Sequence, residues 1–90
     1  MKKIERIILE YGRREYVLPI QAEILDVICR YGEVYLYYSF DPEKRETETR
    51  VFIVAAPHEL DMYHKFYLNH CHNNYGDVVF IVEDFSCTTA

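Results

Sequence analysis

Four side chains in this sequence could together hold a small anion that carries a flat ring. Arg50 opens an apolar segment that His58 follows, and Tyr35 and Tyr37 share one face of a neighbouring segment. Arginine binds phosphate through paired hydrogen bonds, and tyrosine rings stack on bases. We therefore interpret Arg50, His58, Tyr35 and Tyr37 as a candidate ligand-binding set. The alternative is structural, with Arg50 paired to loop acids and both tyrosines packed in a sheet.

A second candidate group is formed by three histidines. His70 and His72 form a His-x-His pair, and His64 lies six residues before His70. On a strand all three would project to the same side. Neutral imidazoles bind Zn²⁺, and a carboxylate or Cys87 would complete such a site. The alternative is a polar hairpin end, so the three histidines stay metal candidates only and no cofactor is predicted.

Cysteine usage bears on both redox compartment and catalysis. The three cysteines are Cys29, Cys71 and Cys87, an odd number whose spacings match no zinc motif. We expect no disulfide framework, which favours a reducing cytosol. Cysteine catalysis needs a nucleophile, a base and an orienting group, and no glycine-rich oxyanion element accompanies Cys71 or Cys87. The sequence therefore predicts a protein that is not an enzyme.

Charge is distributed unevenly along the chain. The net charge is −5, yet residues 1–14 hold five basic residues against two acidic ones, a local net of +3. The basic residues are Lys2, Lys3, Arg6, Arg13 and Arg14. An acidic body disfavours general nucleic-acid binding, which depends on neutralising phosphates. The local basic strip could still hold one anionic group, and the acidic body could instead face a basic protein partner.

Length and composition predict one soluble globular domain over residues 1–90. The chain has 90 residues, half of them hydrophobic, which suits one compact domain and argues against disorder. Charged residues interrupt the N-terminal segment, so no signal peptide is expected. No stretch approaches the roughly 20 apolar residues of a membrane span. We expect a cytoplasmic protein that does not bind membranes.

Alternating apolar residues predict two hairpins in the first half. Strands over residues 4–11 and 15–20 would pair with each other around Gly12. Strands over residues 24–31 and 34–40 would pair around a short glycine turn. A helix over residues 21–30 is the competing interpretation.

The second half is predicted to add three strands. Residues 50–56 form a continuous apolar run, which suggests burial on both faces. Residues 62–72 are interpreted as a strand, with a helix as the alternative, and residues 77–85 as the final strand. The acids Glu83 and Asp84 are expected to be solvated. The expected fold is a small antiparallel sandwich or open barrel of about six or seven strands, with room for one short helix. The uncharged strand 34–40 would be an exposed edge that favours a homo-oligomer.

An ordered set of residues is spread over positions 16 to 85. In chain order it consists of Pro19, Ala22, Ile24, Leu25, Val27, Gly32, Leu36, Asp41, Pro42, Thr47, Arg50, Phe52, Ile53, Val54, His58, Leu60, Val79 and Glu83. In its order and spacing this set resembles a small domain family of unknown function found in phage and bacterial genomes. The resemblance implies a phage or prophage origin and a compact β fold, and it supplies no catalytic residues. The resulting hypothesis is a counter-defence accessory protein that binds a small anionic ligand, such as a host nucleotide immune signal. The alternatives are an acidic inhibitor of a host defence enzyme and a metal-dependent enzyme using the histidines.

Overall fold

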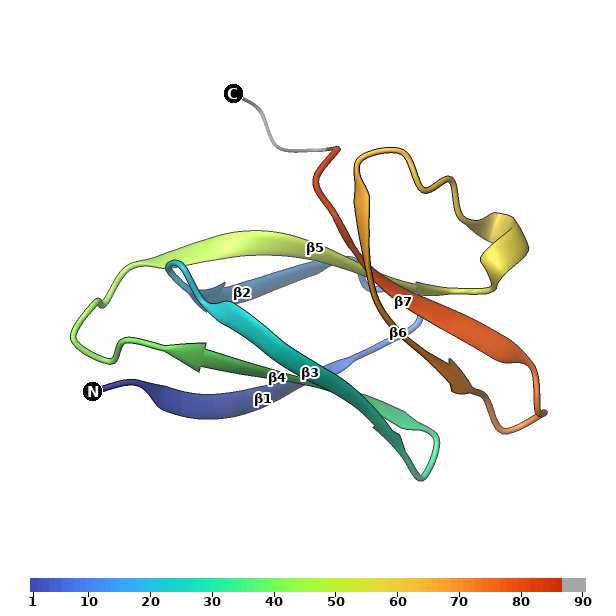
Figure 1. Cartoon of the computed structure of the whole chain (residues 1–90), viewed down its shortest axis with the longest axis horizontal. Helices are drawn as coiled ribbons and strands as arrows, with labels where there is room; N and C mark the ends of the chain where they lie inside the picture. Colours follow the sequence, from blue (N-terminus) through green and yellow to red (C-terminus); the bar gives the residue numbers. More distant parts are fainter. Residues whose placement is uncertain (87–90) are drawn as a thin grey trace.

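The computed structural model describes residues 1–86 of the protein. The chain folds into two antiparallel β-sheets (Figure 1). The first sheet has the order β1–β4–β3 and the second the order β2–β5–β7–β6. The strands are β1 (Lys3–Leu9), β2 (Glu15–Pro19), β3 (Glu23–Arg30), β4 (Glu33–Phe40), β5 (Thr47–Ala55), β6 (Lys65–His72) and β7 (Val78–Asp84). One 3₁₀ turn, η1 (Pro57–Glu59), precedes β6. The predicted mainly β fold of six or seven antiparallel strands is confirmed.

The core lies between the inner faces of the two sheets. Side chains alternate across a strand, so every second residue points inward. The most deeply buried residues of this core come from both sheets and include Leu18, Val27, Leu36, Phe52 and Ile81. In the part of the chain that the structure describes, no helix has the length and apolar composition needed to cross a membrane.

The β3–β4 hairpin agrees with the prediction. Arg30 pairs with Glu33 across the turn, whose central residues Tyr31 and Gly32 have φ angles of 52° and 78°. Two-residue hairpin turns need such positive φ angles to match the twist of the strands. A bulge at Leu25 shifts the register, so Leu25 faces outward. The alternative helix over residues 21–30 is wrong.

The predicted pairing of the first two strands with each other is wrong. β1 pairs with β4 and β2 pairs with β5, so the chain changes sheet in the loop between β1 and β2. The Tyr16 hydroxyl holds this loop in place through two hydrogen bonds. It accepts one from the Glu10 amide at 2.9 Å and donates one to the Arg13 carbonyl at 3.1 Å. β1 and β2 therefore belong to different sheets.

Two further strand predictions are corrected in detail. In β5, Phe52 and Val54 are buried while Val51 and Ile53 are only half-buried, so the strand is not buried equally on both faces. β4 is the central strand of its sheet, so residues 34–40 are not an exposed edge. The argument for self-association from that edge therefore fails, and self-association itself stays a prediction.

The second half ends in a hairpin, as predicted. β6 and β7 are antiparallel neighbours, with His72 opposite Val78, and residues 65–72 are a strand and not a helix. The polar turn between them lies against the β3–β4 turn, because the Asn74 side chain is next to Gly32. The two hairpins therefore meet at one end of the sandwich.

The edge strands β3 and β6 lie against each other and close one side of the sandwich. The Asn69 side-chain amide donates to the Val27 carbonyl across this seam at 2.6 Å. Cys29 and Cys71 form a disulfide across it, with their Cα atoms 6.0 Å apart. The expectation of no disulfide framework is wrong for Cys29 and Cys71. The cysteine argument for a reducing compartment is thereby removed.

Candidate functional site

Arg50 points into the sandwich instead of into a ligand pocket. Its Nε and Nη2 donate to the two carboxylate oxygens of Glu83 at 2.6 and 2.7 Å, and its Nη1 donates to the Ala22 carbonyl at 2.5 Å. Arg50 has the same strand parity as Phe52, and therefore shares the inner face with it. Its hydrogen-bonding groups are used within the protein, so Arg50 links β5, β7 and the start of β3.

His58 lies elsewhere, in η1. Its side chain is 83% exposed, and its Nε2 is 3.9 Å from a carboxylate oxygen of Glu59. It lines a cavity of about 860 Å³ together with Tyr11, Tyr75 and Asp77. No lysine or arginine lines this cavity, and two acids do, so it is a poor site for an anion.

Tyr35 and Tyr37 share the outer face of the first sheet, as predicted. Both are half-buried on β4, while their neighbours Val34 and Leu36 face the core. The Tyr35 hydroxyl donates to a Glu33 carboxylate oxygen at 2.5 Å, and this hydrogen bond is the main cause that raises the pKa of Tyr35. The structure therefore places the four predicted ligand residues in three separate regions and brings only the two tyrosines together.

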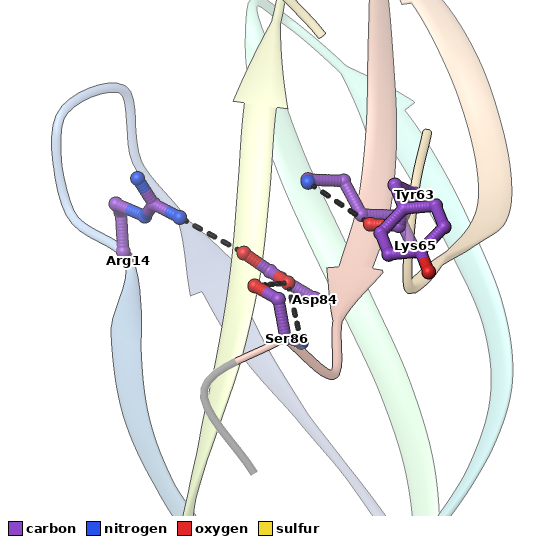
Figure 2. Close-up of polar contacts among 5 residues, drawn as sticks. All are labelled: Arg14, Tyr63, Lys65, Asp84 and Ser86. Atoms are coloured by element: carbon purple, nitrogen blue, oxygen red, sulfur yellow. Dashed lines mark hydrogen bonds and ion pairs between the residues drawn. The ribbon is translucent and has the colours of Figure 1, made fainter. Parts of the chain in front are cut away.

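The acids at the end of β7 are buried and not solvated, which corrects the expectation for Glu83 and Asp84. Asp84 accepts hydrogen bonds from Arg14 at 2.9 Å and from the Ser86 hydroxyl at 2.5 Å. Both contacts are drawn in Figure 2. Burial opposes ionisation of Asp84, but the Ser86 hydrogen bonds and the charges of Lys65 and Arg14 outweigh it, so the pKa of Asp84 is lowered. These contacts hold the loop between β1 and β2 to the end of β7.

The three histidines do not form one cluster. The rings of His70 and His72 lie 6.4 Å apart on β6, whereas His64 precedes the strand in a turn and its ring packs on Tyr63. Within residues 1–86, no three histidine, cysteine or acidic side chains gather closely enough to hold a metal ion. Cys87, the other ligand considered for this site, lies outside the described residues.

A cavity of about 480 Å³ lies at the edge strands β1 and β2, beside the loop that joins them. We call it the β1–β2 cavity. Its walls come from β1, the following loop, β2 and β4. The residues that line it are Arg6, Ile7, Ile8, Glu10, Arg13, Tyr16, Val17 and Tyr35. It therefore combines two cations, two aromatic rings and one acid in one hollow.

Both arginines of the β1–β2 cavity lie over aromatic rings. The guanidinium carbon of Arg6 is 4.6 Å from the ring centre of Tyr35, and that of Arg13 is 4.5 Å from the ring centre of Tyr16. Cation–π contacts of this kind hold a guanidinium in place and leave its N–H groups at the edge. Within the described chain, Arg6 and Arg13 have no carboxylate partner, unlike Arg14 and Arg50.

The remaining contacts of the two arginines are weak. Arg6 donates to the Tyr37 hydroxyl at 3.4 Å, and this hydrogen bond is the main cause that raises the pKa of Arg6. Arg13 uses only its Nε, which donates to the Glu15 carbonyl at 3.2 Å. Both guanidinium groups keep most of their donors for a ligand.

Arg6 and Arg13 were missed as site residues, although two signals in the sequence could have found them. One was the net positive charge of residues 1–14, and the other was strand parity. Arg6 alternates with Ile7 and must face outward beside Tyr35, whereas Arg50 alternates with Val51 and must face inward with Phe52. The pairing of β1 with β4 brings Arg6 next to the tyrosines, and that pairing was not predicted.

No protein-family model, curated protein or solved structure matches this chain. The resemblance to a phage and bacterial domain family therefore stays a prediction.

Proposed function

We propose that this protein binds a small anionic ligand that carries a flat ring, in the β1–β2 cavity. The observation that carries the proposal is the pair Arg6 and Arg13, two arginines held over tyrosine rings in one hollow with no carboxylate partner within residues 1–86. Nucleotides have this chemistry, because they join phosphates to a planar base.

Charge complementarity supports an anion. The chain has a net charge of −5, so unpaired cations gathered in one hollow stand out against an acidic body. Arginine is suited to phosphate because its planar fork donates two parallel hydrogen bonds. The one acid in the wall, Glu10, weakens the field of the two arginines but does not neutralise it.

Size and lining also fit a small molecule. Pockets for small ligands usually span roughly 300–1,000 Å³, and the β1–β2 cavity has about 480 Å³. Tyr35, Ile8 and Val17 supply aromatic and apolar surface beside the two cations. A base stacked on such surface contributes affinity with little sequence preference.

The finer proposal is that the ligand is a host nucleotide immune signal and that the protein is a cytosolic phage counter-defence factor without catalytic activity. It is supported by the family resemblance together with the cavity. The alternative of a histidine-based metal enzyme has less support, because His64 lies apart from His70 and His72. The alternative of an acidic inhibitor rests on net charge alone.

Two-dimensional ¹H–¹⁵N NMR titration tests the location of binding. We expect ADP-ribose or a cyclic dinucleotide to shift the amides of residues 6–8, 13–17 and 35. Adenosine tests the ring without the charge, and pyrophosphate tests the charge without the ring. Both should shift the same amides more weakly. Shifts confined to the cavity beside His58, or none with any of the four compounds, would overturn the proposal.

A further inference from the structure

The disulfide Cys29–Cys71 lies where one side of the sandwich is closed. Cys29 is on β3 and Cys71 is on β6, the edge strands of the two different sheets. Across the seam between these strands, the hydrogen bond from Asn69 to Val27 is the nearby polar link. The opposite pair of edges, β1 and β2, flanks the β1–β2 cavity. The disulfide therefore joins two edge strands that lie against each other.

The two sulfur-bearing residues differ in exposure. Cys29 is exposed to solvent, whereas Cys71 is buried with 5% of its surface accessible. Thiol–disulfide exchange requires the attacking thiolate to reach a sulfur atom, so access decides which sulfur is attacked. Cys29 is the accessible end of this bond.

Cys29 and Cys71 both line a cavity of about 140 Å³ next to the β3–β4 turn. Attack at Cys29 would release the Cys71 thiolate beside this cavity.

We propose that the Cys29–Cys71 disulfide is a redox-sensitive clasp of the β3–β6 seam, opened by small thiols through Cys29. The first thiolate attacks the Cys29 sulfur, forms a mixed disulfide with it and releases the Cys71 thiolate. A second thiolate attacks the sulfur of the first small thiol and releases the Cys29 thiolate. Two electrons pass to the protein, and the two small thiols leave as their own disulfide. The inference is independent of the proposed ligand.

Reducing the Cys29–Cys71 disulfide should weaken the contact between β3 and β6 and lower the free energy of unfolding. The bond closes a loop between residues 42 positions apart, and cross-links of that span restrict the unfolded chain strongly. For a domain of this size we expect dithiothreitol to lower the melting temperature by roughly 10 °C or more. Amide hydrogen exchange should rise in β3 and β6 and stay slow in the centre of β5 and β7.

Three measurements test the clasp. Peptide mapping under non-reducing conditions should recover Cys29 joined to Cys71, and Cys87→Ser should leave both the link and the reductant effect unchanged. Melting of Cys29→Ser and Cys71→Ser should be insensitive to dithiothreitol. In Cys71→Ser, glutathione disulfide should modify Cys29 at least about tenfold faster than it modifies Cys71 in Cys29→Ser.

The wild-type comparison with and without reductant stands even if a serine variant fails to fold. A link to Cys87 in place of the Cys29–Cys71 bond would overturn the proposal. The proposal would also be overturned if dithiothreitol changed neither the wild-type melting temperature nor the amide hydrogen exchange of β3 and β6. Equal reactivity of Cys29 and Cys71 toward glutathione disulfide would overturn it as well.

Discussion

Arg50 and Glu83 form a bidentate ion pair inside the sandwich, with nitrogen–oxygen distances of 2.6 and 2.7 Å. The side chain of Arg50 is 16% exposed and that of Glu83 is 6% exposed. An arginine interpreted as a phosphate ligand is instead a structural link between β5 and β7.

Removing one member of this pair should destabilise the fold strongly. Arg50→Met leaves the Glu83 carboxylate buried without its partner, and losses of this kind cost about 3 kcal/mol. The double variant Arg50→Met with Glu83→Leu should recover a large part of that loss, because no charge stays buried. Urea unfolding measures both, with Arg45→Met in the exposed loop as the control. A single variant as stable as the control would contradict this role.

Asp84 should make the free energy of unfolding depend on pH in the acidic range. Its pKa is lowered in the folded protein, so its ionised form favours folding at pH values above its ordinary pKa. That contribution is lost as the pH falls through the lowered pKa. The difference in unfolding free energy between wild type and Asp84→Asn should be largest above about pH 4 and should vanish in stronger acid. A difference that stays constant from pH 7 to pH 2 would contradict this assignment.

Tyr16 should position Arg13 as well as fill the core. Tyr16→Phe keeps the buried ring but removes the hydroxyl that bonds Glu10 and Arg13. We expect a loss of about 1 kcal/mol in unfolding free energy and weaker binding of anions. Tyr38→Phe is a matched control, because its hydroxyl makes only a 3.4 Å contact with Glu5. Unchanged anion affinity and unchanged unfolding free energy in Tyr16→Phe would show that the Tyr16 hydroxyl does not position the β1–β2 loop.

Much of the fold could be predicted from strand periodicity. The β3–β4 hairpin follows from alternation around Gly32, and the β6–β7 hairpin from the turn that ends at Gly76, because each joins strands that are neighbours in the chain. The partners of β1 and β2 could not be predicted, since the choice of partner depends on how the two sheets pack. Burial of Glu83 was missed for the same reason, because its partner Arg50 lies 33 residues away.

The candidate site was predictable only in its components. The excess of basic residues at the N-terminus and the two outward tyrosines of β4 were both visible in the sequence. Their meeting depends on the register that sets Arg6 opposite Tyr37 and Ile8 opposite Tyr35. No local pattern encodes that register, so the grouping of Arg6 with Tyr35 required the structure.

Glu10 should weaken anion binding at the β1–β2 cavity. It is the acid in a wall that also holds Arg6 and Arg13. Glu10→Gln removes its charge but keeps its size, so affinity for pyrophosphate should rise about two- to fivefold, as expected for an exposed charge. Calorimetric titration at low salt measures the change, and Glu43→Gln in the distant loop is the control. Equal affinity in both variants would show that the ligand binds away from this wall.

The most direct test of the proposed function is isothermal titration of ADP-ribose and cyclic dinucleotides into wild type and into the double variant Arg6→Met with Arg13→Met. Methionine keeps much of the packing and removes both charges. We predict saturable binding by wild type and a loss of at least about tenfold in affinity for the double variant. Arg45→Met should bind as wild type does. Absence of binding to wild type, or equal affinity in the double variant, would contradict the proposed function.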